Sequence, residues 1–288
     1  MGLPRRPDFV IIGTTKGGTS WIVQNLQVQA GVSIPMRPEA GLHFFSRHYD
    51  KGTDWYLDHF AGIGDEIALV GEKSASYLPH PDVPGRLQAL LPQARLIAQL
   101  RNPVDRAYSD YCMHVRRGQA DRDIERYLDP ERTPIPRLVQ DGLYFKHLSA
   151  YLDRFDADQL LVTIYEEMER RPEQVLEAIC GHLGIENPVL SENIGQRVKG
   201  KDASMLPLAV RTYLAPFKGV VAPFRQTAAF KAARSLIARP NQYPPLTASV
   251  RRRLTDYFRP DVEALARFLG RDLDEWTRDQ AMPVAKTA

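Results

Sequence analysis

Short runs of apolar residues alternate along the chain with longer segments in which apolar residues recur at helical spacing. The short runs, rich in valine, isoleucine and leucine, are predicted strands at Phe9–Gly13, Ala68–Glu72, Arg95–Leu100 and Leu160–Tyr165. The longer segments are predicted helices at Thr19–Gln29, Val83–Leu91, Val104–Arg117, Phe145–Phe155 and Pro172–Leu183. Such alternation is typical of an α/β fold in which a central parallel sheet is flanked by helices.

The C-terminal part of the chain continues the helical pattern. Ala248–Phe258 and Asp261–Leu269 are predicted as two separate helices, because Pro260 lies between them and proline interrupts a helix. A chain of 288 residues is long enough for one large α/β domain. We expect this single domain to cover residues 8–277 and residues 278–288 to form a disordered tail.

Composition excludes several classes of protein. The formal net charge is only +3, which argues against a general nucleic-acid binder and requires any anion site to be local. Cys112 and Cys180 lie far apart without paired spacing, which argues against a disulfide framework and a zinc site. No signal region precedes the first strand and no run reaches eighteen apolar residues, so we expect a cytoplasmic protein.

One stretch of the chain departs from this even charge balance. Between residues 203 and 255 there is no aspartate or glutamate. The basic residues of the stretch are Arg211, Lys218, Arg225, Lys231, Arg234, Arg239 and Arg251–Arg253. A segment of one sign is either a solvated helix face, a clamp on an anionic acceptor, or a surface for peripheral membrane contact.

A glycine-bearing turn leads directly from the first strand into a helix. Its sequence is Gly13-Thr14-Thr15-Lys16-Gly17-Gly18-Thr19-Ser20. A turn of this kind directs backbone N–H groups and the positive end of a helix at one point, which suits a phosphate. Thr19 stands where nucleotide triphosphatases carry their lysine, and the cation is instead Lys16.

A second anion site follows the strand Arg95–Leu100, which ends in Arg101-Asn102-Pro103. A triphosphatase needs a carboxylate for magnesium at this place, whereas an arginine repels a metal ion and attracts a phosphate. One phosphate loop and a separate arginine site fit adenosine 3′,5′-bisphosphate (PAP) better than ATP. We therefore expect a site without metal.

The loop Gly13–Ser20 resembles a motif of the PAPS-dependent sulfotransferases. Four other segments resemble further motifs of that family: His43-Phe44-Phe45, Trp55-Tyr56, Gly71–Tyr77 and Arg101–Ser109. The similarity is strongest to the heparan sulfate sulfotransferases and their bacterial relatives, and it runs from residue 8 to about residue 276. It implies a P-loop-like three-layer fold. It also implies an enzyme that transfers a sulfuryl group from 3′-phosphoadenosine 5′-phosphosulfate (PAPS) to a hydroxyl or amine of an acceptor, a carbohydrate or glycolipid.

The resemblance assigns the donor site residue by residue. It implies that the 5′-phosphosulfate is held by the loop, and that Arg101 and Ser109 hold the 3′-phosphate. The loop residues concerned are Thr15, Lys16, Gly17, Gly18, Thr19, Ser20 and Trp21. Arg239 is a further candidate for the 3′-phosphate, although Arg239-Pro240-Asn241-Gln242 departs from the lysine-glycine-arginine loop of the relatives.

The resemblance also suggests catalytic residues. Lys16 and Lys73 would neutralise charge near the transferred group. The relatives carry their general base, a glutamate, two positions before the histidine, where this chain has Gly41. Two candidates remain for the base: His43, which we expect to titrate at roughly pH 6 to 7, and Glu39, which the Ala40-Gly41 turn would have to fold into the site.

Two other functions remain open at this point. A divergent P-loop kinase or triphosphatase would need magnesium and ATP. A non-catalytic PAP-binding or membrane-associated protein of the same fold would have lost its base with the change at Gly41. The sequence carries no signal for the acceptor's identity or for oligomeric state.

Overall fold

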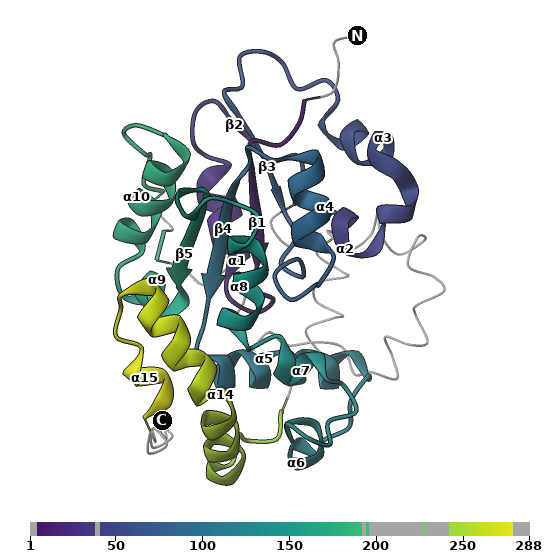
Figure 1. Cartoon of the computed structure of the whole chain (residues 1–288), viewed down its shortest axis with the longest axis vertical. Helices are drawn as coiled ribbons and strands as arrows, with labels where there is room; N and C mark the ends of the chain where they lie inside the picture. The colour runs from purple at the N-terminus through teal and green to yellow at the C-terminus, as the bar shows by residue number, and fades with distance from the viewer. Residues whose placement is uncertain (1–4, 38–40, 192–193, 196–226, 228–241, 279–288) are drawn as a thin grey trace.

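A five-stranded sheet forms the centre of the computed structural model, which describes residues 5–37, 41–191, 194–195, 227 and 242–278. Its strand order is β2-β3-β1-β4-β5, and every neighbouring pair is parallel. The strands are β1 (Phe9–Gly13), β2 (Val32–Ser33), β3 (Leu69–Lys73), β4 (Arg95–Leu100) and β5 (Leu160–Ile164). Figure 1 shows helices on both sides of this sheet.

Helices join the strands and cover both faces of the sheet. Their bounds are α1 (Thr19–Leu26), α2 (Phe44–Arg47), α3 (Gly52–Leu57), α4 (Val83–Leu90), α5 (Pro103–Arg117), α6 (Ile124–Tyr127), α7 (Arg137–Gln140), α8 (Tyr144–Leu152), α9 (Tyr165–Arg170), α10 (Pro172–Leu183), α14 (Ala248–Leu269) and α15 (Asp274–Thr277). Short 3₁₀ turns cover Tyr49–Lys51, Asp58–Phe60 and Ala157–Gln159.

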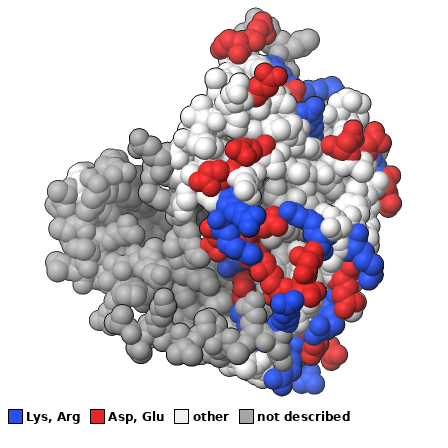
Figure 2. Space-filling view, turned by 90° about the vertical axis from the view of Figure 1, so that its left-hand side faces the viewer, with Lys and Arg blue, Asp and Glu red and all other residues white. Residues whose placement is uncertain are grey.

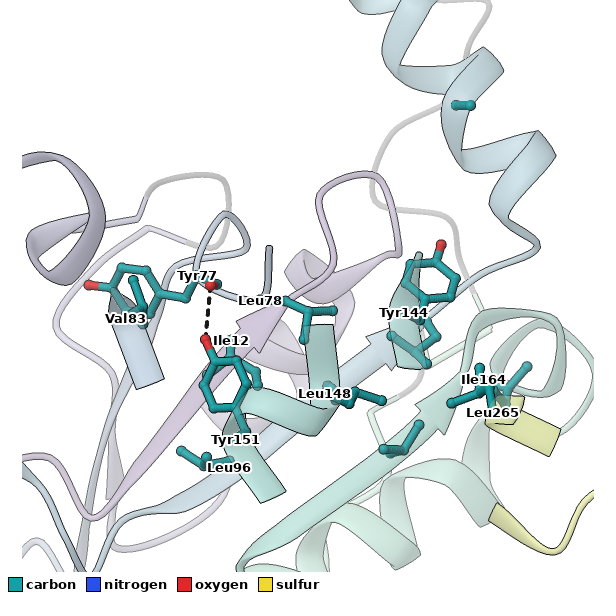
Figure 3. Packing of buried hydrophobic residues seen from close by; sticks show 14 of the residues in the cluster. Ile12, Tyr77, Leu78, Val83, Leu96, Tyr144, Leu148, Tyr151, Ile164 and Leu265 are labelled. Carbon is teal, nitrogen blue, oxygen red and sulfur yellow. Dashed lines mark hydrogen bonds between the residues drawn. The ribbon is translucent and has the colours of Figure 1, made fainter. Parts of the chain in front are cut away.

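Alternate residues of β1 enter two different hydrophobic cores. Phe9 and Ile11 pack with α1 and α10 on one face, whereas Val10 and Ile12 pack with α4, α5, α8 and α14 on the other. Figure 3 shows Ile12 in the second core. All four side chains are fully buried, which explains why the strand is a continuous apolar run rather than an alternating one. The predicted three-layer α/β fold is confirmed.

The predicted strands and most predicted helices are confirmed within a few residues. The strand β2 was not predicted, because two residues at the edge of a sheet leave no periodic signal. The strand β3 ends one residue later than predicted, so Lys73 is its last residue. This shift puts Lys73 at the carboxyl edge of the sheet.

The prediction of two C-terminal helices separated at Pro260 is wrong, because α14 is one helix from Ala248 to Leu269. The apolar residues that α14 buries in the core recur at intervals of three and four on both sides of the proline. They are Val250, Leu254, Phe258, Val262 and Leu265. An interior proline costs a helix about 3 kcal/mol. Burial of one large apolar side chain contributes about 1.5–3 kcal/mol, so this stripe offsets the cost.

Asp261, the residue after this proline, also holds α8 in place. Its carboxylate accepts hydrogen bonds from the backbone N–H groups of Phe145 and Lys146, each at 3.0 Å. These two residues belong to the first turn of α8, which has no side-chain cap of its own. Asp261 therefore replaces a local N-cap from a distant helix.

We expect Asp261→Ala to lower the free energy of unfolding by about 1–2 kcal/mol, the usual cost of losing a helix cap. Urea unfolding followed by circular dichroism measures this change. The matched control is Asp256→Ala on the same helix, since Asp256 makes an exposed ion pair with Arg259 at 3.0 Å. That pair should contribute under about 0.5 kcal/mol. Equal destabilisation by the two variants would contradict the capping role.

Candidate active site

The order of the strands determines where a ligand can bind. Because β1 lies between β3 and β4, the connections that follow these strands diverge and leave a crevice at their carboxyl ends. The segments that meet there are the loop after β1, the turn after β3 and the start of α5 after β4. They enclose an open cavity of about 550 Å³. The predicted site residues that line it are Thr15, Lys16, Gly18, Thr19, Ser20, Trp21, His43, Lys73, Arg101 and Ser109.

The loop after β1 is shaped by its two adjacent glycines. A Cβ atom on Gly17 would lie 2.5 Å from the backbone oxygen of Gln99 in β4. Gly18 has a φ of +90°, and a Cβ atom there would lie 2.8 Å from the ring of Tyr165. Only glycine therefore lets the loop pass this close to β4 and turn into α1. The first residues of α1, Thr19 and Ser20, then border the cavity where the N–H groups of a helix start favour an anion.

Two further loop residues tie the loop to its surroundings. The Thr15 hydroxyl donates to the backbone oxygen of Ala75 at 3.1 Å, which joins the loop to the turn after β3. The indole N–H of Trp21 donates to the backbone oxygen of Ile194 at 2.6 Å, and the side chain is almost fully buried. Thr15 and Trp21 therefore support the loop as well as lining the cavity.

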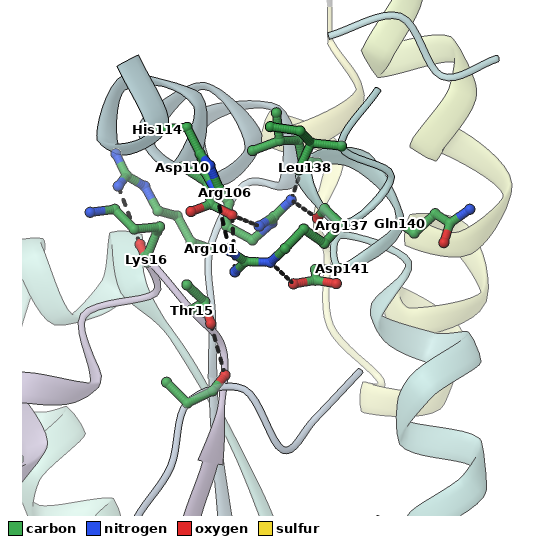
Figure 4. A network of polar contacts seen from close by, with 12 residues as sticks. Thr15, Lys16, Arg101, Arg106, Asp110, His114, Arg137, Leu138, Gln140 and Asp141 are labelled. Atoms are coloured by element: carbon green, nitrogen blue, oxygen red, sulfur yellow. Dashed lines mark hydrogen bonds and ion pairs between the residues drawn. The ribbon is translucent and has the colours of Figure 1, made fainter. Parts of the chain in front are cut away.

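Arg101 and Ser109 border the same cavity although the sequence alone did not require it. The Arg101 guanidinium lies 4.5 Å from the ring centroid of Tyr165 and donates to the backbone oxygen of Lys16 at 3.4 Å. Figure 4 shows Arg101 beside the loop residues Thr15 and Lys16. Ser109 is in the middle of α5, and the packing of this helix turns it toward the cavity.

A buried carboxylate holds the turn after β3 against α3 and, through Ser74, against the residue that precedes α2. Glu72 is fully buried and accepts hydrogen bonds from the hydroxyls of Ser74 at 2.7 Å, Tyr77 at 2.7 Å and Tyr56 at 2.8 Å. Burial raises the pKa of this carboxyl group, and the three hydroxyls oppose the shift. Ser74 in turn accepts the backbone N–H of His43 at 2.9 Å. Because its oxygens are occupied in this way, Glu72 is a structural group.

His43 sits at the edge of the cavity in an unusual backbone conformation. Its φ is +53°, and its Nδ1 atom is 2.8 Å from the hydroxyl oxygen of Ser76. Burial lowers the pKa of the imidazole from 6.5 to about 4, with further lowering by the positive charges of Arg47 and Lys73 and by His48. The pKa lies below the range of 6 to 7 that the sequence suggested, because a sequence does not reveal desolvation.

The position of the relatives' glutamate is occupied by a tightly packed glycine. A Cβ atom on Gly41 would lie 2.9 Å from the backbone oxygen of Lys73 and 3.1 Å from Nε2 of His43. Glu39, the other candidate base, lies outside the described residues, as does Arg239, the additional candidate for the 3′-phosphate. His43 is the candidate base that the structure describes.

Four further arginines, none of them assigned as a site residue from the sequence, also line the cavity: Arg47, Arg116, Arg117 and Arg137. A signal was available for two of them, since Arg116 and Arg117 follow Ser109 by seven and eight residues and share its helix face. Arg47 follows His43 by four residues on α2. Arg137, from the short helix α7, had no such signal.

Arg137 belongs to a network of charges behind the cavity wall (Figure 4). Its guanidinium pairs with Asp110 at 3.2 Å and with Asp141 at 3.6 Å. Asp110 is fully buried and also pairs with the buried Arg106 at 3.6 Å. These contacts fix the orientation of Arg137 at the cavity edge.

The described part of the basic stretch is engaged in ion pairs. Arg251 pairs with Asp105 at 2.8 Å and Arg253 pairs with Glu125 at 3.0 Å. Residues 203–226 and 228–241, and with them most of the predicted clamp or membrane surface, lie outside the described residues. On the face shown in Figure 2, basic and acidic side chains alternate rather than form a patch of one sign.

Two kinds of feature are absent from the described residues. In the ranges given above, no helix is long and apolar enough to cross a membrane. Within the same ranges, no three histidine, cysteine, aspartate or glutamate side chains are grouped so that they could hold a metal ion.

A glycine-rich phosphate loop at the switch point of a parallel sheet defines the class of nucleotide-binding α/β proteins. Within this class, the pattern described as "Sulfotransferase domain" matches residues 6–204, and the chain belongs to the sulfotransferase family. The predicted family is thereby confirmed. Enzymes of this family use PAPS as the sulfuryl donor.

Individual relatives are consistent with this assignment. Human bifunctional heparan sulfate N-deacetylase/N-sulfotransferase 2 is 30% identical over 299 residues, covering 96% of this chain and 31% of the relative. Human heparan sulfate glucosamine 3-O-sulfotransferase 3B1 is 31% identical over 199 residues, covering 67% of this chain and 50% of the relative. The chain thus spans 31% of the length of the first of these curated relatives and 50% of the second.

A solved structure agrees over nearly the whole chain. The crystal structure of a sulfotransferase from Alicyclobacillus acidocaldarius superposes with a TM-score of 0.69 at 27% identity. The match covers 95% of this chain and 100% of that one.

We expect His43 to remain neutral from about pH 8 down to about pH 5, because its pKa is lowered to about 4. The unfolded chain binds this proton more tightly, so the contribution of His43 to folding stability is lost as the pH falls from 6.5 to about 4. NMR titration of the imidazole, assigned with His43→Ala, measures the midpoint. A midpoint near 6.5 would show that the ring is solvated.

Proposed function

We propose that this chain transfers a sulfuryl group from PAPS to a hydroxyl or amine of an acidic carbohydrate. The observation that carries the proposal is that one cavity joins the phosphate loop, Arg101, Lys73, His43 and a wall of arginines. Donor, base and acceptor site are therefore within reach of one another.

The residues of the cavity fit the donor. Lys16, Thr19 and Ser20 offer a cation, two hydroxyls and the start of α1 to the 5′-phosphosulfate. Arg101 and Ser109 offer a guanidinium and a hydroxyl to the 3′-phosphate. The loop lies so close to β4 that a Cβ atom is excluded at Gly17 and Gly18, and it leads directly into the start of α1.

The chemistry requires charge stabilisation and a proton acceptor. When bound, PAPS supplies a sulfuryl group whose bond to the 5′-phosphate oxygen breaks as a bond to the acceptor forms. Lys16 and Lys73 stabilise the negative charge that develops near the leaving oxygen. His43, which is neutral, takes the proton that the acceptor hydroxyl or amine loses.

The acceptor is inferred from the charges that the donor does not use. Arg47, Arg116, Arg117 and Arg137 come from three helices, α2, α5 and α7, and line the same cavity. Several guanidinium groups around one space favour a substrate with carboxylate or sulfate groups. The names of the two curated relatives, which act on heparan sulfate, support a carbohydrate of this kind.

We expect Arg101→Ala to weaken the binding of PAP at least about tenfold, the equivalent of one charge-assisted hydrogen bond. The affinity for adenosine 5′-phosphosulfate, which has no 3′-phosphate, should change much less. Calorimetric titration without magnesium measures both, and Arg95→Ala at the other end of β4 is the matched control. Equal losses for the two ligands, or a requirement for magnesium, would remove Arg101 from this role.

The acceptor is tested by transfer of ³⁵S from labelled PAPS. We expect a polymer of alternating uronic acid and glucosamine to be sulfated, and its carboxyl-reduced form to react with a higher KM. Arg117→Gln should raise the KM for the acidic polymer several-fold by removing one cation. Arg259→Gln, outside the cavity, is the control. If the neutral polymer reacts as well as the acidic one, the acceptor is not selected by charge.

A further inference from the structure

We propose that Ser76, together with Ser46, holds His43 in the tautomer that carries its proton on Nδ1 and leaves Nε2 free to accept one. Ser76 is then a positioning residue, since it acts on the reaction through His43. The inference rests on the proposed function for its catalytic meaning, but the tautomer itself is a property of the free protein.

Two side-chain contacts and one contact between a side chain and the backbone form a closed ring that begins and ends on His43. Nδ1 of the imidazole lies 2.8 Å from the Ser76 hydroxyl oxygen. The Ser76 oxygen lies 3.4 Å from the Ser46 hydroxyl oxygen. The Ser46 hydroxyl donates to the backbone carbonyl of His43 at 3.4 Å, one helical turn away. Each member of the ring therefore touches two others.

The directions of these hydrogen bonds follow from the contact between the Ser46 hydroxyl and the carbonyl of His43. A carbonyl oxygen can only accept, and we assign the one proton of Ser46 to the carbonyl of His43, which also accepts the backbone N–H groups of Arg47 at 2.7 Å and His48 at 3.3 Å. The Ser46 oxygen then accepts the proton of Ser76. Ser76 has no second proton, so its oxygen accepts from Nδ1–H of His43. A neutral imidazole carries one proton, which leaves Nε2 with a free lone pair.

The backbone of His43 is fixed by the same turn. Its N–H donates to Ser74 at 2.9 Å, and Ser74 donates to the buried Glu72 at 2.7 Å. Ser74 and Ser76 thus hold the main chain and the ring of one residue. Ser74 directly follows Lys73 and Ser76 lies three residues after it, so the base and a cation of the cavity are held by one turn.

The surroundings of Nε2 agree with a role as proton acceptor. Gly41 is next to this atom, and a Cβ atom there would come within 3.1 Å of it. The glycine therefore leaves the side of Nε2 less crowded than any other residue would. His43, Ser76 and Lys73 line the same cavity, which allows an acceptor group to approach the ring.

The experiment combines ¹⁵N NMR of histidine-labelled protein with steady-state kinetics. The ¹⁵N shifts of the two ring nitrogens distinguish the tautomers at neutral pH, and His43→Ala assigns the signals. Ser76→Ala should move the proton toward Nε2 and lower kcat about tenfold, as expected for one neutral hydrogen bond, with little change in the KM for PAPS. Ser76→Thr, which keeps the hydroxyl, should restore both readouts.

The controls separate this role from a purely structural one. Ser46→Ala breaks the other end of the ring and should shift the tautomer in the same direction. Ser149→Ala removes a hydroxyl that donates to Phe145 at 2.8 Å on α8 and should change neither readout.

A proton on Nε2 in the unaltered protein, or an unchanged tautomer and kcat in Ser76→Ala, would overturn the proposal. Absence of sulfuryl transfer with the Nδ1–H tautomer in place would instead refute the proposed function.

Discussion

The hydrogen bonding of the buried Glu72 carboxylate is the interaction on which the candidate active site depends. Glu72 lies next to the last residue of β3, and its carboxylate is bonded by hydroxyls from α3 and from the turn that follows the strand. Burying a carboxylate is costly, and three hydroxyl donors are needed to compensate it. These hydrogen bonds hold the sheet, α2 and α3 in one arrangement. They thereby fix the positions of His43 and Lys73 relative to the loop after β1.

The cavity that results is strongly positive, which explains the properties of its histidine. Lys73 and Arg47 disfavour a charged imidazole, and partial burial adds to their effect. A neutral histidine is the form that can accept a proton. Phosphate and sulfate groups bound in the same cavity would oppose the cations, so the basicity of His43 should rise when the donor is present.

A second buried carboxylate, that of Asp110, positions one of the four arginines that line the cavity, as Glu72 positions the turn after β3. Asp110 is fully buried between Arg106 and Arg137, and this pairing turns one guanidinium toward the cavity while the other stays in the core. Removing one partner of such a network leaves an unpaired buried charge. The direction in which Arg137 faces is thus set by packing between α5 and α7.

The sequence by itself determined the parallel α/β fold, because strand periodicity is local in the chain. For the same reason it predicted an anion site at the glycine turn after β1 and at Arg101. It also predicted an interruption at Pro260 that the apolar stripe of α14 overrides. Only the tertiary structure decided that Ser109 and Arg101 border one cavity, that Arg137 joins them, and that the pKa of His43 is low. These properties depend on helix packing and desolvation, which arise from residues far apart in the sequence.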